Sequence, residues 1–274
     1  MHIAVCNGIH IHYRVEGKEG APALLLINPI ATDLRVWDRV VDILKDEFRI
    51  IRFDERGHGL SDTPQSPYTM ADEIDDIKGL LDHLGVDEAL VCGTSVGGLI
   101  AQGFYAAYPQ CVSGLVLCCT NSWFGGPERW DPMMELVAEQ GMEALAGRFM
   151  EVWFPAAFRS RFAAEVQGWR NMSLRTPVMG FLGTAAVLRD SDLREAAGQI
   201  KVPTIVLAGD EDGATTPDIV ESFAATIPGA KFRLAKGSGH IPSAAAPQAV
   251  ADAIRAVAGK SGVRRILACW PPDQ

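Results

Sequence analysis

Residues 89–108 read Ala-Leu-Val-Cys-Gly-Thr-Ser-Val-Gly-Gly-Leu-Ile-Ala-Gln-Gly-Phe-Tyr-Ala-Ala-Tyr, and Pro109 follows them directly. The run from Ala89 to Cys92 is uniformly apolar, which is typical of a buried central strand. The run from Val96 to Tyr108 has the length of a helix, and the proline would end it. Ser95 lies between them in the pattern G-x-S-x-G. The stretch therefore predicts a strand, a sharp turn and a helix in succession.

The residues around Ser95 suit a reactive hydroxyl. Gly93 and Gly97 remove side chains that would clash in so tight a bend. The helix that begins at Val96 would direct free backbone N–H groups toward a developing negative charge. This setting predicts a nucleophilic serine, and the alternative is an ordinary Gly-Ser loop at a helix start.

Strand-like and helix-like runs alternate on both sides of this stretch. Two short strands, Ile3–Cys6 and Ile9–Val15, flank Asn7-Gly8, which is a strong hairpin signal. Further strands are predicted at residues 23–27, 48–53, 112–119, 202–208 and 232–235, and helices at 35–44, 70–84, 219–225 and 247–257. Such alternation predicts an α/β fold, with a mostly parallel central sheet and helices on both of its faces.

The alternation stops between residues 121 and 199, where several helices are predicted without strands. We expect residues 1–120 and 200–260 to form one core, 121–199 to form a helical cap, and 261–274 to form a C-terminal tail. Four of the six tryptophans and six of the eight methionines fall in the predicted cap. These side chains suit a cap over a pocket, although most of them must also form the cap's own core.

A serine hydroxyl needs a base near neutral pH, and two of the six histidines are the main candidates. His58 follows the predicted strand 48–53, and His240 lies in the loop between the last strand and the last helix. In a fold of this kind the acid and then the histidine follow the serine along the chain. His58 precedes Ser95, so His240 is the predicted base.

The base needs a carboxylate that fixes its tautomer and stabilises its charged form. Three carboxylates follow the strand 202–208, and we predict Asp212 because a loop that reaches sideways needs a few residues to turn. Asp210 remains the alternative, and Glu211 fits an acidic surface loop. The oxyanion hole should use the backbone N–H groups of Val96 and Ile30.

These motifs resemble those of the α/β-hydrolases. Residues 93–98 (Gly-Thr-Ser-Val-Gly-Gly), 209–217 (Gly-Asp-Glu-Asp-Gly-Ala-Thr-Thr-Pro) and 237–240 (Gly-Ser-Gly-His) are similar to that family's nucleophile, acid and histidine motifs. Residues 54–62 (Asp-Glu-Arg-Gly-His-Gly-Leu-Ser-Asp) resemble the family's loop after its fourth strand, which is structural there. The resemblance implies the α/β-hydrolase fold and a serine mechanism that requires neither a metal nor an organic cofactor.

A closer resemblance, over residues 3–258, is to the 3-oxoadipate enol-lactonases, which hydrolyse a small lactone in aromatic catabolism. It is carried by residues 28–38 (Asn-Pro-Ile-Ala-Thr-Asp-Leu-Arg-Val-Trp-Asp), 141–142 (Gly-Met), 153–155 (Trp-Phe-Pro) and 203–206 (Pro-Thr-Ile-Val). Their substrate carries a carboxylate, and the family tends to have Trp-x-x-Arg at the start of its cap. Here Met133 stands where that arginine would be.

The resemblance implies a substrate-binding pocket beneath the cap. Its expected residues are Trp130, Arg129, Arg35, Trp153 and Met133, with Arg129 or Arg35 in the role of the missing arginine. We expect a hydrolase that opens 3-oxoadipate enol-lactone or a close analogue through an acyl-enzyme. The alternatives are another small-ester carboxylesterase, a C–C bond hydrolase, a cofactor-free perhydrolase, and a non-catalytic small-molecule binding protein on the same fold.

The composition bears on partners and compartment. The net charge of −9 and the pI of about 5.2 argue against a nucleic-acid or anionic-membrane surface. The N-terminus does not resemble a signal peptide, no apolar run is long enough to span a membrane, and no two of the six cysteines form C-x-x-C. We expect a cytoplasmic protein with a small-molecule substrate and no nucleic-acid or membrane partner, and homo-oligomer formation is left open.

Overall fold

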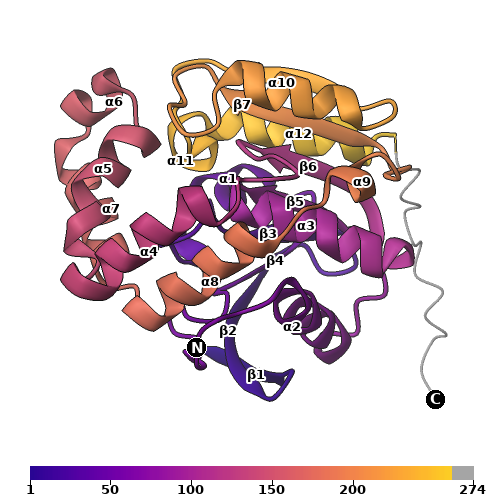
Figure 1. Ribbon diagram of the computed structural model, residues 1–274. Coiled ribbons are helices and arrows are strands. Elements are labelled where there is room, and N and C mark those ends of the chain that lie inside the picture. The colour runs from indigo at the N-terminus through magenta and orange to yellow at the C-terminus, as the bar shows by residue number, and fades with distance from the viewer. Residues whose placement is uncertain (261–274) are drawn as a thin grey trace, which may run out of the picture.

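A mostly parallel sheet of eight strands runs through the computed structural model, which describes residues 1–260 (Figure 1). The strands are β1 (His2–Cys6), β2 (Ile9–Gly17), β3 (Ala23–Ile27), β4 (Arg49–Phe53), β5 (Ala89–Thr94), β6 (Val112–Cys118), β7 (Thr204–Gly209) and β8 (Lys231–Ala235). Their order is β1-β2-β4-β3-β5-β6-β7-β8; β2 pairs antiparallel with both β1 and β4, and all the other pairs are parallel. The predicted tail, 261–274, lies outside the described residues.

Helices cover both faces of this sheet, as predicted. Helices α1 (Asp38–Leu44) and α12 (Pro247–Ala258) pack against each other, and α2 (Met70–His83) packs against α3 (Val96–Ala107). Helix α10 (Pro217–Thr226) lies against β7 and β8. The shorter helical elements are η1 (Leu34–Trp37), η2 (Pro109–Cys111) and α11 (Pro242–Ala245). The architecture is that of the predicted α/β-hydrolase fold.

Local sequence signals explain several of these boundaries. The hairpin turn places Asn7 at φ 47° and Gly8 at φ 80°, a conformation that both residues tolerate. Helix α2 begins with a capping box in which the Asp72 carboxylate accepts the N–H of Thr69 at 2.8 Å, and the Thr69 hydroxyl accepts the N–H of Asp72 at 3.2 Å. Gly85, at φ 62°, follows the end of that helix.

The predicted helix 35–44 is instead two elements, η1 and α1. The Asp33 side chain accepts the N–H of Arg35 at 3.0 Å, and the Asp54 carboxylate accepts the N–H of Leu34 at 2.8 Å. These bonds hold the first turn in the tighter 3-10 form, so that the regular α-helix begins only at Asp38.

Between β6 and β7 the chain forms a helical segment, and Figure 1 shows all of its helices except the last grouped at one side of the sheet, whereas the last one lies apart from them against α3. Its helices are α4 (Pro127–Gln140), α5 (Glu143–Trp153), α6 (Ala156–Arg161), α7 (Ala163–Leu174), α8 (Val178–Asp190) and α9 (Arg194–Ala197). The two ends of the segment meet, because an isolated β-bridge joins Trp123 to Asp192 and the N–H of Leu193 donates to the carbonyl of Ser122 at 2.8 Å.

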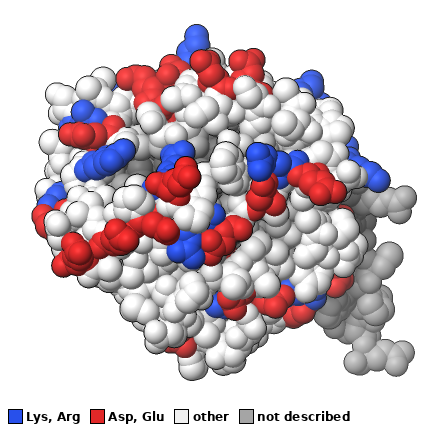
Figure 2. All heavy atoms as spheres, viewed as in Figure 1, with Lys and Arg blue, Asp and Glu red and all other residues white. Residues whose placement is uncertain are grey.

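The order of the central strands determines where a ligand can bind. Strands β3 and β5 are neighbours, and the loop after β3 leads to α1, which packs on α12, whereas the loop after β5 leads to α3, which packs on α2. In α/β sheets, ligands bind where the loops of neighbouring strands leave for opposite faces in this way. On the face shown in Figure 2, acidic and basic side chains are interspersed. Within residues 1–260, no helix combines the length and the apolar character needed to cross a bilayer.

Candidate active site

Ser95 lies at the turn between β5 and α3, where the backbone is strained. Its φ of 57° and ψ of −120° fall in a region that residues with a side chain rarely adopt. The N–H of Ser95 donates to the carbonyl of Cys118 at 2.9 Å, and the hydroxyl of Thr120 donates to the carbonyl of Ser95 at 2.6 Å. These bonds to the end of the neighbouring strand fix the turn.

The glycines of the turn are required by close backbone contacts. A Cβ atom on Gly93 would lie 2.2 Å from the carbonyl oxygen of Gly97, and one on Gly97 would lie 2.4 Å from the carbonyl oxygen of Ile27. Backbone atoms of packed strands and helices cannot move aside as a flexible side chain could. The predicted reason for both glycines is therefore confirmed.

His240 follows β8, and its imidazole pairs with Asp212, which follows β7. Nδ1 of His240 lies 2.8 Å from Oδ2 of Asp212, and both side chains are buried. Burial opposes ionisation of the carboxylate, but the neighbouring His240 and hydrogen bonds from Thr215 and Ala214 hold the pKa of Asp212 below its usual value. The ionised carboxylate fixes the proton of the imidazole on Nδ1 and leaves Nε2 available.

Between the candidate acids, the geometry favours Asp212. Asp210 is exposed, and its carboxylate accepts the backbone N–H of Ser238 at 3.2 Å. Glu211 is also exposed. The loop thus turns far enough for its third carboxylate, and not its first, to reach the imidazole.

Ser95 and His240 line one pocket, together with Ile30. Among residues 1–260, neither the Ser95 hydroxyl nor Nε2 of His240 makes a hydrogen bond, to each other or to any other group. Hydrogen bonds between catalytic groups are often long in ligand-free structures and tighten only when substrate is bound. Both groups are free to engage a ligand in the pocket.

Two backbone N–H groups near Ser95 are also without a partner in the described part of the chain, those of Ile30 and Val96. Ile30 belongs to the loop after β3 and lines the pocket, whereas Val96 is the first residue of α3. Unpaired N–H groups are costly unless they meet an acceptor, so their freedom suits the predicted oxyanion hole.

The loop that carries Ile30 is held by His58, in keeping with the structural role that the resemblance implies for residues 54–62. Nε2 of His58 accepts the N–H of Ala31 at 3.0 Å, and its Nδ1 donates to the carbonyl of Arg56 at 3.1 Å. Burial lowers the pKa of His58, which keeps the ring neutral and Nε2 able to accept. Ala31 itself has a φ of 62°, so the loop turns sharply at the residue that His58 binds.

The start of the same loop is anchored by a buried carboxyl group. The N–H and the side-chain amide of Asn28 donate to the two oxygens of Glu55, each at 2.6 Å. The indole N–H of Trp37 donates to the amide oxygen of Asn28 at 2.8 Å. Burial raises the pKa of Glu55 to about 8, against the effect of the bonds from Asn28.

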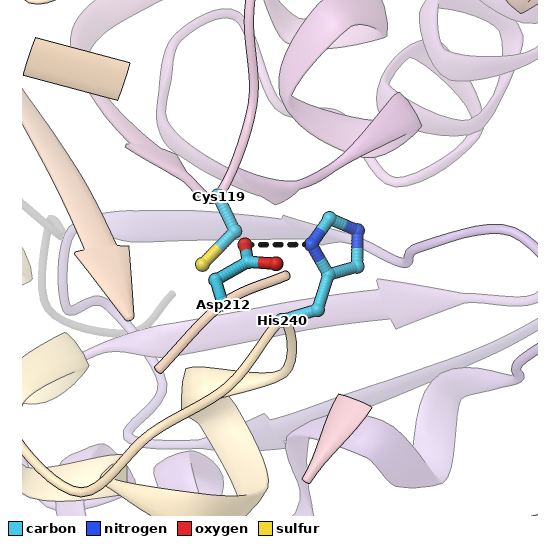
Figure 3. A group of neighbouring side chains, drawn as sticks. All are labelled: Cys119, Asp212 and His240. Atoms are coloured by element: carbon cyan, nitrogen blue, oxygen red, sulfur yellow. Dashed lines mark hydrogen bonds and ion pairs between the residues drawn. The ribbon is translucent and has the colours of Figure 1, made fainter. Parts of the chain in front are cut away.

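Cys119, which follows β6, lies beside the Asp212–His240 pair (Figure 3). Its sulfur accepts the N–H of Gly209 at 3.4 Å and donates to the carbonyl of Gly239 at 3.7 Å. The thiol thus bonds the end of β7, three residues before Asp212, to the loop that carries His240. Its position at the end of a central strand is the signal by which the sequence could have pointed to it.

The chemistry of this trio does not favour a metal site. The three ligand atoms lie within 4.8 Å of one another. However, burial and the charge of Asp212 raise the pKa of Cys119 well above its usual value, so the sulfur stays a thiol, and metals bind the thiolate. Nδ1 of His240 is already bonded to the carboxylate.

The pocket has a volume of about 150 Å³, and four of the five predicted substrate-binding residues line it: Arg129, Trp130, Met133 and Trp153. The indole N–H of Trp130 donates to the carbonyl of Phe124 at 3.1 Å, which fixes the ring in the wall. Phe149, which the sequence did not single out, stacks on Trp153 with 5.0 Å between the ring centroids. The walls are largely apolar.

Arg35 was predicted to line the pocket, and it does not. Its guanidinium binds both oxygens of Asp33, at 2.9 and 2.6 Å, and it lines a separate cavity instead. A second arginine that sequence reasoning missed, Arg148 on α5, lines the pocket with Arg129. Within residues 1–260, neither Arg129 nor Arg148 has an ion pair or a side-chain hydrogen bond. The pocket therefore carries two positive charges without counter-ions.

Comparison with known proteins finds a matching family model and several similar proteins. The family model described as alpha/beta hydrolase fold matches residues 22–246. 3-Oxoadipate enol-lactonase 2 of Acinetobacter baylyi is 28% identical over 249 residues, which cover 91% of this chain and 93% of that protein. The crystal structure of the enol-lactonase from Burkholderia xenovorans LB400 superposes with a TM-score of 0.90 at 32% identity, covering 94% of this chain and 100% of that one. A hydrolase from Pseudomonas aeruginosa PA01 superposes with a TM-score of 0.89 at 35% identity, covering 94% and 98%.

Proposed function

Because this chain belongs to the alpha/beta hydrolase fold family, we propose that it is a serine hydrolase that opens the ester bond of a small lactone or carboxylic ester. The proposed substrate is 3-oxoadipate enol-lactone or a close analogue that carries a carboxylate. Relatives that are named enol-lactonases, at 28% and 32% identity over most of the chain, support this class of substrate.

One observation carries the choice of an anionic substrate. Arg129 and Arg148 line the same small pocket as Ser95 and His240, and neither arginine is paired within the described residues. A carboxylate bound by two guanidinium groups would compensate both charges while the apolar walls enclose the lactone ring. A pocket of about 150 Å³ suits a small substrate rather than a long acyl chain.

In the proposed mechanism the Ser95 oxygen attacks the acyl carbon while Nε2 of His240 takes its proton. Asp212, 2.8 Å from Nδ1, stabilises the imidazolium that forms. The N–H groups of Ile30 and Val96 bind the oxyanion of the tetrahedral intermediate. His240 then returns the proton to the leaving oxygen, which in a lactone stays tethered to the acyl-enzyme. Water activated by His240 hydrolyses that ester and frees the serine.

The test is turnover of 3-oxoadipate enol-lactone beside a panel of uncharged short-chain esters. The Ser95→Ala variant should lose roughly 10⁴- to 10⁶-fold in kcat, with circular dichroism unchanged. Ser222→Ala, on α10 outside the pocket, should keep full activity. Full turnover by folded Ser95→Ala would reject the serine mechanism. Tight binding of the lactone without release of a hydrolysed product would favour the non-catalytic alternative.

A further inference from the structure

We propose that a second cavity binds a small organic acid, with an apolar body and a carboxylate head, outside the catalytic pocket. This cavity has a volume of about 320 Å³ and shares no lining residue with the pocket around Ser95. It lies between strand β2, the segment 32–35 that follows the oxyanion loop, and the connection from α7 to α8. Its volume is in the range in which proteins bind small molecules.

Three arginines from separate parts of the chain line this cavity, Arg14, Arg35 and Arg175. Arg35 is compensated by Asp33. Arg14 has no ion pair within residues 1–260, and the printed bond of the Arg175 side chain goes to the carbonyl of Asn171 at 3.0 Å, which is uncharged. Two guanidinium groups are therefore left without a counter-ion at one cavity.

The two acidic side chains of the cavity, Asp33 and Asp54, bind other groups and make no ion pair with Arg14 or Arg175. Asp33 binds Arg35. An oxygen of Asp54 lies 2.8 Å from Nδ1 of His12, and the Asp54 oxygens also accept hydrogen bonds from the N–H groups of Leu34 and Leu60 at 2.8 Å each. The lining thus holds three guanidinium groups against two carboxylates, an excess of positive charge that favours an added anion. Arginine binds a carboxylate through two parallel hydrogen bonds.

The remaining walls indicate that the anion has an apolar body. Leu34, Leu60 and Met172 line the cavity with the arginines. Leu60 is 57% exposed, which is unusual for so large an apolar side chain in a cavity wall, and a hydrocarbon body would cover it. An inorganic anion would neutralise the arginines but leave the Leu60 side chain in water, whereas Leu34 is already buried. The combination favours an organic acid.

The test is calorimetric titration of the full chain with hexanoate. Arg129→Gln/Arg148→Gln serves as the reference protein, so that the charges of the catalytic pocket do not contribute. In that protein hexanoate should bind at one saturable site. Adding Arg14→Gln and Arg175→Gln should weaken binding at least about tenfold, whereas adding Arg233→Gln, on β8, should not.

Two further ligands test separately the need for a negative charge and the need for an apolar body. Hexanamide, which lacks the charge, and inorganic phosphate, which lacks the apolar body, should each bind at least about tenfold more weakly than hexanoate. Both lost arginines are exposed, so the thermal midpoint of the variant should match that of the reference. Unchanged affinity after Arg14→Gln and Arg175→Gln would overturn the site, and equal affinity for hexanamide or phosphate would overturn the class of ligand.

Discussion

Nε2 of His58 accepts the backbone N–H of Ala31 at 3.0 Å, one residue beyond the proposed oxyanion donor Ile30. The ring is buried and its other nitrogen donates to the carbonyl of Arg56. His58, the alternative to His240 as the predicted base, thus supports the loop whose residue Ile30 lines the same pocket as Ser95. Its contribution to the reaction would be made through the position of Ile30.

Replacing His58 should therefore impair the chemical step more than substrate binding. We expect His58→Ala to lower kcat by about 10- to 100-fold with little change in KM, because the N–H of Ile30 would no longer be held in place. His58→Gln, whose amide oxygen can accept the N–H of Ala31, should recover part of the rate. Exposed His83 on α2 offers the matched control, His83→Ala. An unchanged kcat in folded His58→Ala would contradict this role.

Cys119 should act as a positioning residue for the acid and the base. Loss of its bonds to Gly209 and Gly239 in Cys119→Ala should lower kcat about three- to tenfold and leave KM nearly unchanged. Cys119→Ser keeps a donor and an acceptor and should lie between this variant and the native protein. Steady-state kinetics would measure kcat and KM of both variants, with Cys111→Ala on η2 as the control. Equal rates for Cys119→Ala and the native protein would rule it out.

The arginine pair of the pocket should discriminate between charged and uncharged lactones. Arg129→Gln/Arg148→Gln should raise KM for a lactone that carries a carboxylate by about 10- to 100-fold, because two charge-assisted contacts are removed. KM for an uncharged lactone of similar size should change little. The two substrates control for each other, because both are measured with the same variant. An equal rise in KM for both lactones would show that the arginines contribute only to the shape of the pocket and not to the binding of charge.

Glu55 should make the stability of the protein depend on pH. Burial raises its pKa from 4.5 to about 8, so in the interval between these values the folded chain keeps a proton that the unfolded chain releases. The free energy of unfolding should therefore fall as pH rises through this interval and level off above it. Glu55→Gln cannot ionise and should flatten the decline. Urea unfolding of both proteins from about pH 5 to about pH 9 would show this, and identical slopes would contradict it.

Much of the fold was readable because its strands are continuous apolar runs. Ala23–Ile27 forms β3 with the predicted bounds, since a strand buried on both faces needs no polar alternation. The capping box at Thr69 likewise set the start of α2 from local chemistry alone. Ser95 and His240 could be placed from a turn motif and from their order along the chain.

The remaining features depend on which residues, distant in the sequence, the fold brings together, and no local sequence pattern indicates this. Arg35 was misplaced because its direction is set by the bidentate contact with Asp33. Arg148 lies within a helix with no motif around it, and only the packing of α5 brings it to the pocket. The role of Cys119 requires the ends of three neighbouring strands to meet, which is a property of the assembled sheet.

The hydrogen bond between Leu193 and Ser122 closes the base of the helical segment, and the strands on either side of that segment, β6 and β7, are neighbours in the sheet. Recombination between related genes could thus exchange the whole insert without altering strand order. Ser95, Asp212 and His240 lie outside the insert, whereas Arg129 and Arg148 lie inside it. Under the proposed function, such a chimera would inherit its chemistry from one parent and its choice of substrate from the other.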